Sequence, residues 1–96
     1  MFSQLDEVEK RFEELTSLMG DPSVAGDPSR YSEIAREHAG LVETVESWRA
    51  YKTTQQELET TRELLTDDDP DMRDMAKDEL GELEAQRDEL EAKLKL

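Results

Sequence analysis

The 96-residue chain carries a net charge of −14, and about half of it is Ala, Glu, Lys, Leu or Arg. That composition is typical of long helices and coiled coils, and the length allows one small domain. Because the chain has no cysteine, a disulfide framework and thiolate metal sites are excluded, and a single histidine disfavours zinc sites and catalytic triads.

Charge and hydropathy also bear on partners and location. A net charge of −14 argues against autonomous binding to nucleic acids and to anionic membrane surfaces, because both need clustered Lys and Arg. The N-terminus lacks the basic region and apolar run of a signal peptide, and no stretch approaches the length of a membrane span. We therefore expect a cytoplasmic protein without membrane partners.

The first predicted helix covers residues 3–19. Its apolar residues follow a heptad seam on one face, formed by Leu5, Val8, Phe12, Leu15 and Met19. Ser3 followed by Asp6 resembles a capping box at the start, and Gly20 is a natural stop. The Gly-, Pro- and Asp-rich stretch over residues 20–28 is predicted to be a loop.

The second predicted helix covers residues 29–65 and is the longest. Asp27 can act as its N-cap, and Pro28 suits the first turn because its missing N–H costs nothing there. One stripe of residues at helical spacing runs along it: Tyr31, Ile34, His38, Leu41, Val45, Trp48, Lys52, Gln55, Leu58, Arg62 and Leu65. The stripe becomes polar from Lys52 to Arg62, so we expect the helix to fray or bend in this stretch.

The third predicted helix covers residues 70–94 and begins in the same way, with Asp69 as cap and Pro70 in the first turn. Its apolar face is formed by Met72, Met75, Ala76, Leu80, Leu83, Arg87, Leu90 and Leu94. The loop before it is short, so this helix should fold back antiparallel on the second.

These elements predict an all-α fold, a three-helix antiparallel coiled-coil-like arm with one long central helix, as a single domain over residues 1–96. The two shorter helices would share the long one end to end, and Trp48 would be buried where they meet. A compact bundle in which all three helices overlap is the alternative, but the unequal helix lengths disfavour it.

The sequence offers no candidate catalytic, cofactor-binding or metal-ligating residues, and we expect no cofactor and no enzymatic activity. The run Asp67 to Asp69 with Asp71 lacks the glycine and distal glutamate of a calcium loop, so a solvated turn with a helix cap is expected. His38 lies on the apolar stripe and is expected to be half-buried and hydrogen-bonded to a neighbour. The residues alone therefore predict a helical binding or spacer module.

Several strings of residues, in this order, resemble a known family. They are Phe12-Glu13-Glu14-Leu15, Gly20-Asp21-Pro22, Arg30-Tyr31, Ala35-Arg36-Glu37-His38-Ala39 and the block from Asp69 to Leu80. Together they resemble the N-terminal helical domain of the bacterial peptide chain release factor 1 family, the class I factors for UAA and UAG. That resemblance implies a role in translation termination, in which a stop codon is recognised and peptidyl-tRNA is hydrolysed.

The resemblance also implies what lies outside this chain and what the chain contacts. In the family, the Gly-Gly-Gln hydrolysis motif and the codon-recognition tripeptide lie in later domains that this sequence does not contain, so we expect a piece of a longer protein. The family's N-terminal arm lies toward the stalk-base region of the ribosome and is implicated in contact with the class II GTPase release factor. Partner-binding residues cannot be assigned to it.

Two alternatives from other classes remain open. One is a stand-alone acidic coiled-coil interaction protein that homodimerises, at least weakly, through its seam. The other is a small acidic chaperone or anti-factor that mimics nucleic acid by its charge.

Overall fold

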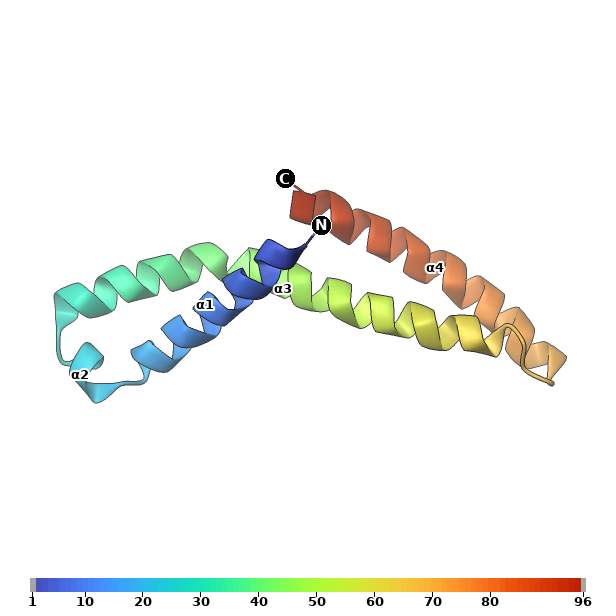
Figure 1. The fold of residues 1–96 in the computed structure, drawn as a ribbon, viewed down its shortest axis with the longest axis horizontal. Helices are drawn as coiled ribbons and strands as arrows, with labels where there is room; N and C mark the ends of the chain where they lie inside the picture. Colours follow the sequence, from blue (N-terminus) through green and yellow to red (C-terminus); the bar gives the residue numbers. More distant parts are fainter. Residues whose placement is uncertain (1, 96) are drawn as a thin grey trace. The chain divides into compact units, whose positions relative to one another are not determined.

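The computed structural model describes residues 2–95. Over these residues the chain is all-α, as predicted, and consists of α1 (Ser3–Met19), α2 (Pro22–Ala25), α3 (Pro28–Leu64) and α4 (Pro70–Lys95), with no strand (Figure 1). The chain divides into two compact units between Glu46 and Ser47, so that α3 contributes its first half to one unit and its second half to the other. None of the described helices combines the length and apolar character needed to cross a bilayer.

In the first unit, α1 lies beside the first half of α3, and the two are joined through the short helix α2 (Figure 1). The buried apolar side chains of this unit are Leu15, Val24 and Val45, which are at most 1% exposed. The buried residue of α2 is Val24, so this short helix contributes to the core of the unit. The prediction of a loop over residues 20–28 missed this helix, so the described chain has four helices instead of three.

The sequence predicted the end of α1 correctly but not the cap at its start. Phe2 occupies the N-cap position, and no side chain bonds to the free N–H groups there, so the predicted capping box of Ser3 and Asp6 is wrong. Gly20 does follow the last helical residue, as predicted. Its φ of −89° is right-handed, and its N–H donates to the Ser17 carbonyl at 3.1 Å, so the turn closes without the left-handed glycine conformation.

The two longer helices begin at Asp-Pro pairs, and the predicted caps are confirmed. Asp27 Oδ1 accepts a hydrogen bond from the Arg30 backbone N–H at 3.2 Å, next to the start of α3. Asp69 Oδ1 accepts one from the Asp71 N–H at 2.9 Å, next to the start of α4. Each carboxylate thus satisfies a donor that the first helical turn leaves free.

In the second unit, α4 lies antiparallel beside the second half of α3 (Figure 1). Its buried side chains are Trp48, Tyr51, Thr54, Leu58, Thr61, Ala76 and Leu83, each at most 8% exposed. The predicted stripe on α3 is therefore wrong at three positions, because Lys52, Gln55 and Arg62 are exposed while their neighbours Tyr51, Thr54 and Thr61 are buried. Trp48 is buried, but the end-to-end sharing of α3 stays a prediction.

Two residues assigned to apolar faces turn out to be exposed. Met75 is 65% exposed, because the buried face of α4 passes from Met72 to Ala76 and then to Leu80, which leaves Met75 on the flank. Tyr31, in the first turn of α3, is 36% exposed. Both positions lie near a helix start, where the partner helix covers less of the surface.

Candidate functional site

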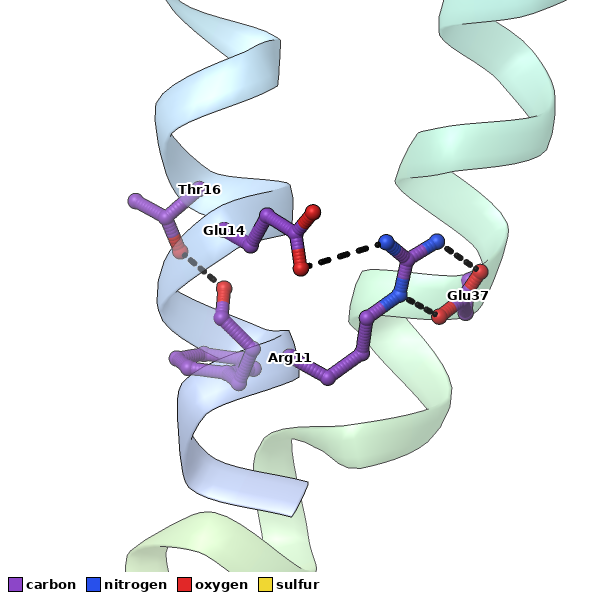
Figure 2. A network of polar contacts seen from close by, with 5 residues as sticks. Arg11, Glu14, Thr16 and Glu37 are labelled. Carbon is purple, nitrogen blue, oxygen red and sulfur yellow. Dashed lines mark hydrogen bonds and ion pairs between the residues drawn. The ribbon is translucent and has the colours of Figure 1, made fainter. Parts of the chain in front are cut away.

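An ion pair between helices organises the first unit. The Arg11 guanidinium on α1 donates two hydrogen bonds to the Glu37 carboxylate on α3, Nε to Oε2 at 2.6 Å and Nη2 to Oε1 at 2.9 Å (Figure 2). A third contact of 3.5 Å joins Arg11 Nη1 to Glu14 on the same helix. The two-pronged geometry fixes how far α1 can slide along α3, because both donors must meet one carboxylate.

The charges of this pair perturb each other in the expected direction. The hydrogen bonds from Arg11 lower the pKa of Glu37, despite the opposing effect of desolvation. The same hydrogen bonds raise the pKa of Arg11. Both side chains are more than two-fifths exposed, so solvent screens the attraction and the pair serves mainly to set register.

The predicted environment of His38 is confirmed. Its side chain is half-buried, stacks on the Phe12 ring at a centroid distance of 4.2 Å, and lies with Nε2 2.9 Å from Thr16 Oγ1. The Thr16 hydroxyl also donates to the Phe12 carbonyl at 2.9 Å (Figure 2), so it connects the backbone of α1 with the His38 ring on α3. The contacts of His38 with Phe12 and Thr16 therefore join α1 to α3.

The tip between α3 and α4 is an ordered acidic turn. Asp67 Oδ1 accepts a hydrogen bond from the Asp69 N–H at 2.9 Å, and Arg73 Nη1 donates to the carbonyl oxygens of Asp67 at 2.6 Å and Asp68 at 3.2 Å. These contacts confirm the interpretation of the aspartates as a turn and helix cap. In the part of the chain that the structure describes, no group of acidic and histidine side chains is arranged to hold a metal ion.

A partly buried hydrogen bond links the helices of the second unit. Tyr51 Oη donates to Glu91 Oε1 at 2.9 Å and accepts from Gln55 Nε2 at 3.2 Å. The Tyr51 ring stacks on Trp48 at a centroid distance of 5.9 Å, and Lys52 Nζ lies 5.1 Å from the centroid of the Trp48 ring. Burial is the main reason that the pKa of Tyr51 is raised, and the contact with Glu91 adds to it.

The second unit also carries an open groove of about 430 Å³, which we call the threonine groove. It is lined by Thr53, Gln56, Glu57, Thr60, Thr61 and Leu64 of α3 and by Glu79 of α4. The apolar spacing of α3 does not predict this groove, because the predicted stripe lies one residue away from the buried face. The polar run Thr53, Thr54, Thr60 and Thr61 was the available signal.

The ion pair of Arg11 and Glu37 was also missed, although a signal for it exists. Arg11 directly precedes the seam residue Phe12, and Glu37 directly precedes the stripe residue His38. Positions that flank a seam are where opposite charges pair between helices. Which of the flanking charges meet depends on the register of the two helices, and the structure decides that.

Known proteins are similar to this chain along its whole length. The chain is 43% identical over its whole length to peptide chain release factor 1 of Listeria welshimeri and of Listeria innocua, and it covers 27% of each. It is 45% identical to peptide chain release factor 1 of Geobacter sulfurreducens and covers 26% of that protein. The chain thus spans about a quarter of the length of these relatives, in their N-terminal part. No solved structure gives a significant match.

The family itself follows from a match that is nearly as long as the chain. The model of the PCRF domain matches residues 8–96, which include most of the first compact unit, the whole of the second, and all of α2, α3 and α4. The resemblance to release factor 1 inferred from the sequence strings is confirmed by the identities above. This chain belongs to the PCRF domain family.

Proposed function

We propose that this chain is the N-terminal arm of a translation termination factor that directs stop-codon-dependent hydrolysis of peptidyl-tRNA on the ribosome. The observation that carries the proposal is the match along the whole chain, at 43–45% identity, to the N-terminal part of release factor 1. Such a factor would act in the cytoplasm on UAA and UAG codons.

Within that factor, the arm would be a protein-contact module and not the catalytic part. Two observations support this role. The polar contacts of Arg11, His38 and Tyr51 hold helices together and orient no reactive group. The exposed faces are strongly acidic, which favours basic protein surfaces as partners. We propose the stalk-base region of the ribosome and the class II GTPase release factor as these partners.

A chimera tests the proposal. The N-terminal part of Listeria welshimeri release factor 1 that aligns with this chain is replaced by the chain, which is feasible because the alignment covers all 96 residues. Peptide release is measured on ribosomes programmed with UAA, UAG or UGA, with and without the class II GTPase factor. The unmodified factor, a version lacking the arm, and a version carrying an unrelated helical hairpin serve as controls.

The expected result is that the chimera releases peptide at UAA and UAG, and is recycled by the GTPase factor, as efficiently as the unmodified factor. The armless version and the hairpin version should be defective in GTPase-dependent recycling. A chimera that behaves like the hairpin version would overturn the proposal. The isolated chain, added to the same ribosomes, should release no peptide above background.

Self-association is a separate part of the proposal. The half-buried leucines of α4 leave some seam uncovered, so we expect the isolated chain to be a monomer with weak homodimerisation. Sedimentation velocity over a wide concentration range tests this. A tight dimer would instead favour the stand-alone coiled-coil interpretation.

A further inference from the structure

Apart from Thr61 and Leu64, the residues that line the threonine groove are exposed, and its shape suits an elongated partner. Its α3 residues recur every three or four positions from Thr53 to Leu64, so they form one continuous face of the helix. That face is about 16 Å long at about 1.5 Å per residue. The groove is open along its length, which suits a helix lying in it better than a small molecule that must be enclosed.

The floor of the groove is suited to close packing. Thr61 is only 4% exposed, and Leu64 is half-buried. The Thr60 hydroxyl donates to the Gln56 carbonyl at 3.2 Å, so it needs no partner from a bound molecule. Side chains of this size allow a second helix to approach closely, because the distance between packed helices depends on the side chains at the contact.

The rims of the groove determine the charge of its occupant. Glu57 on α3 and Glu79 on α4 are exposed, and neither carboxylate makes a hydrogen bond or an ion pair with any residue that the structure describes. A partner that brings Lys or Arg to both rims would gain two ion pairs, which steer association and fix orientation. A nucleic acid would instead meet two carboxylates, and a second copy of this chain, with its charge of −14, would be repelled.

We propose that the threonine groove is a docking site for an amphipathic helix of a basic partner protein, with small apolar side chains on the groove floor and Lys or Arg against Glu57 and Glu79. This proposal deepens the protein-contact role proposed above by naming the site and the class of partner. The docking proposal depends on the groove alone, so an experiment can reject it without rejecting the role in termination.

The test uses the chain and synthetic helical peptides. The probe peptide has Ala and Leu along one face and Lys on both flanks of that face. Two reference peptides keep its composition with a scrambled order, or replace Lys by Glu. Binding is followed by the amide resonances of the chain in nuclear magnetic resonance titrations. Only the probe peptide should bind, and it should shift the resonances of Thr53, Gln56, Thr60 and Glu79.

Variants separate docking from general attraction between opposite charges. The double variant E57K/E79K should weaken binding by about tenfold, because two attractions become repulsions. The matched variant E59K/E82K makes the same charge change on the same two helices but outside the groove, and should weaken binding much less. The variant T53Y leaves the charge unchanged and fills the groove, and should abolish the shifts.

Three outcomes would overturn the proposal. They are equal weakening by both double variants, undiminished binding to the T53Y variant, and equal binding of the scrambled peptide. Circular dichroism of each variant confirms that the helices are intact before binding is compared. If the termination chimera works but the probe peptide does not bind in the groove, only the docking site is rejected.

Discussion

Arg11 on α1 and Glu37 on α3 are 26 residues apart in the chain, and their side chains meet in two parallel hydrogen bonds of 2.6 and 2.9 Å. A guanidinium and a carboxylate match each other in this geometry only at one register of the two helices. The pair therefore reports whether α1 is correctly docked.

Replacing Arg11 by Lys tests the geometry of this pair. Lys keeps the positive charge but cannot donate in a fixed fork, so we expect a small loss of stability that shrinks further in high salt. Thermal unfolding followed by circular dichroism measures it. R11A should be at most slightly less stable than R11K, because the side chains of Arg11 and Glu37 are both more than two-fifths exposed. A large loss in R11A alone would show that charge, and not geometry, matters.

The same pair predicts a dependence on pH. The folded state lowers the pKa of Glu37 below its usual value of 4.5, so folding favours the ionised carboxylate. Its contribution to stability is present above that value and is lost as the pH falls through the lowered pKa. Urea unfolding is measured at pH values from about 6 to about 2. Over this range, E37Q should lose less stability than the natural chain. Parallel curves would contradict this assignment.

Leu58 should dominate the stability of the second unit. Its side chain is 0% exposed, and L58A would remove buried methyl groups and leave a cavity, which costs about 2–5 kcal/mol. Met75 provides the matched control, because it is 65% exposed and M75A should change stability by less than about 0.5 kcal/mol. Urea unfolding of both variants tests the difference. Similar losses in the two would mean that α4 packs through a different face.

Removing the Tyr51 hydroxyl should cost about 1 kcal/mol, because Y51F leaves Glu91 and Gln55 without their shared hydrogen-bond partner. Because the pKa of Tyr51 is raised above its usual value of 10.0, its contribution to stability is present below that value and declines as the pH rises through the raised pKa. Y51F should therefore lose less stability than the natural chain on going to alkaline pH. Tyrosinate absorbance in a Y31F background measures the ionisation of Tyr51 directly.

Asp69 should contribute to the start of α4 through its carboxylate. D69A removes the acceptor for the Asp71 N–H and should cost about 1 kcal/mol, whereas D69N keeps an oxygen at the same place and should cost less. Hydrogen exchange of the Asp71 amide tests the local effect. Equal exchange rates in D69A and the natural chain would show that the cap is dispensable.

Much of the fold could be predicted because its signals are local. The Asp-Pro pairs at residues 27–28 and 69–70 combine a capping carboxylate with a ring that suits the first turn, and both helices begin there. The seam of α1 is strictly periodic, and Leu15 at its centre is fully buried. In contrast, Val24 sits among turn-forming residues, and α2 is shown by the backbone hydrogen bonds from the N–H groups of Ala25 and Gly26 to the carbonyls four residues earlier.

The face of α3 beyond Trp48 could not be predicted in the same way. Positions 51 to 62 offer threonines, glutamines and charges on every side, so periodicity does not distinguish Tyr51 and Thr54 from Lys52 and Gln55. The packing of α4 selects the side that can bury a ring and methyl groups while long charged side chains stay in water. The threonine groove, which follows from that selection, was beyond sequence reasoning for the same reason.

The all-helical class, the starts of the long helices and the family resemblance could be predicted from the amino-acid sequence. They depend on overall composition, on capping residues and on short characteristic strings, and none of these requires knowledge of how the helices pack. The tertiary structure decided which charges pair and which threonines are buried. Those outcomes depend on the register between helices, and register is set by the sum of many contacts along both partners. The ion pair of Arg11 and Glu37 and the hydrogen bond of Tyr51 to Glu91 are the two contacts that depend most clearly on this register.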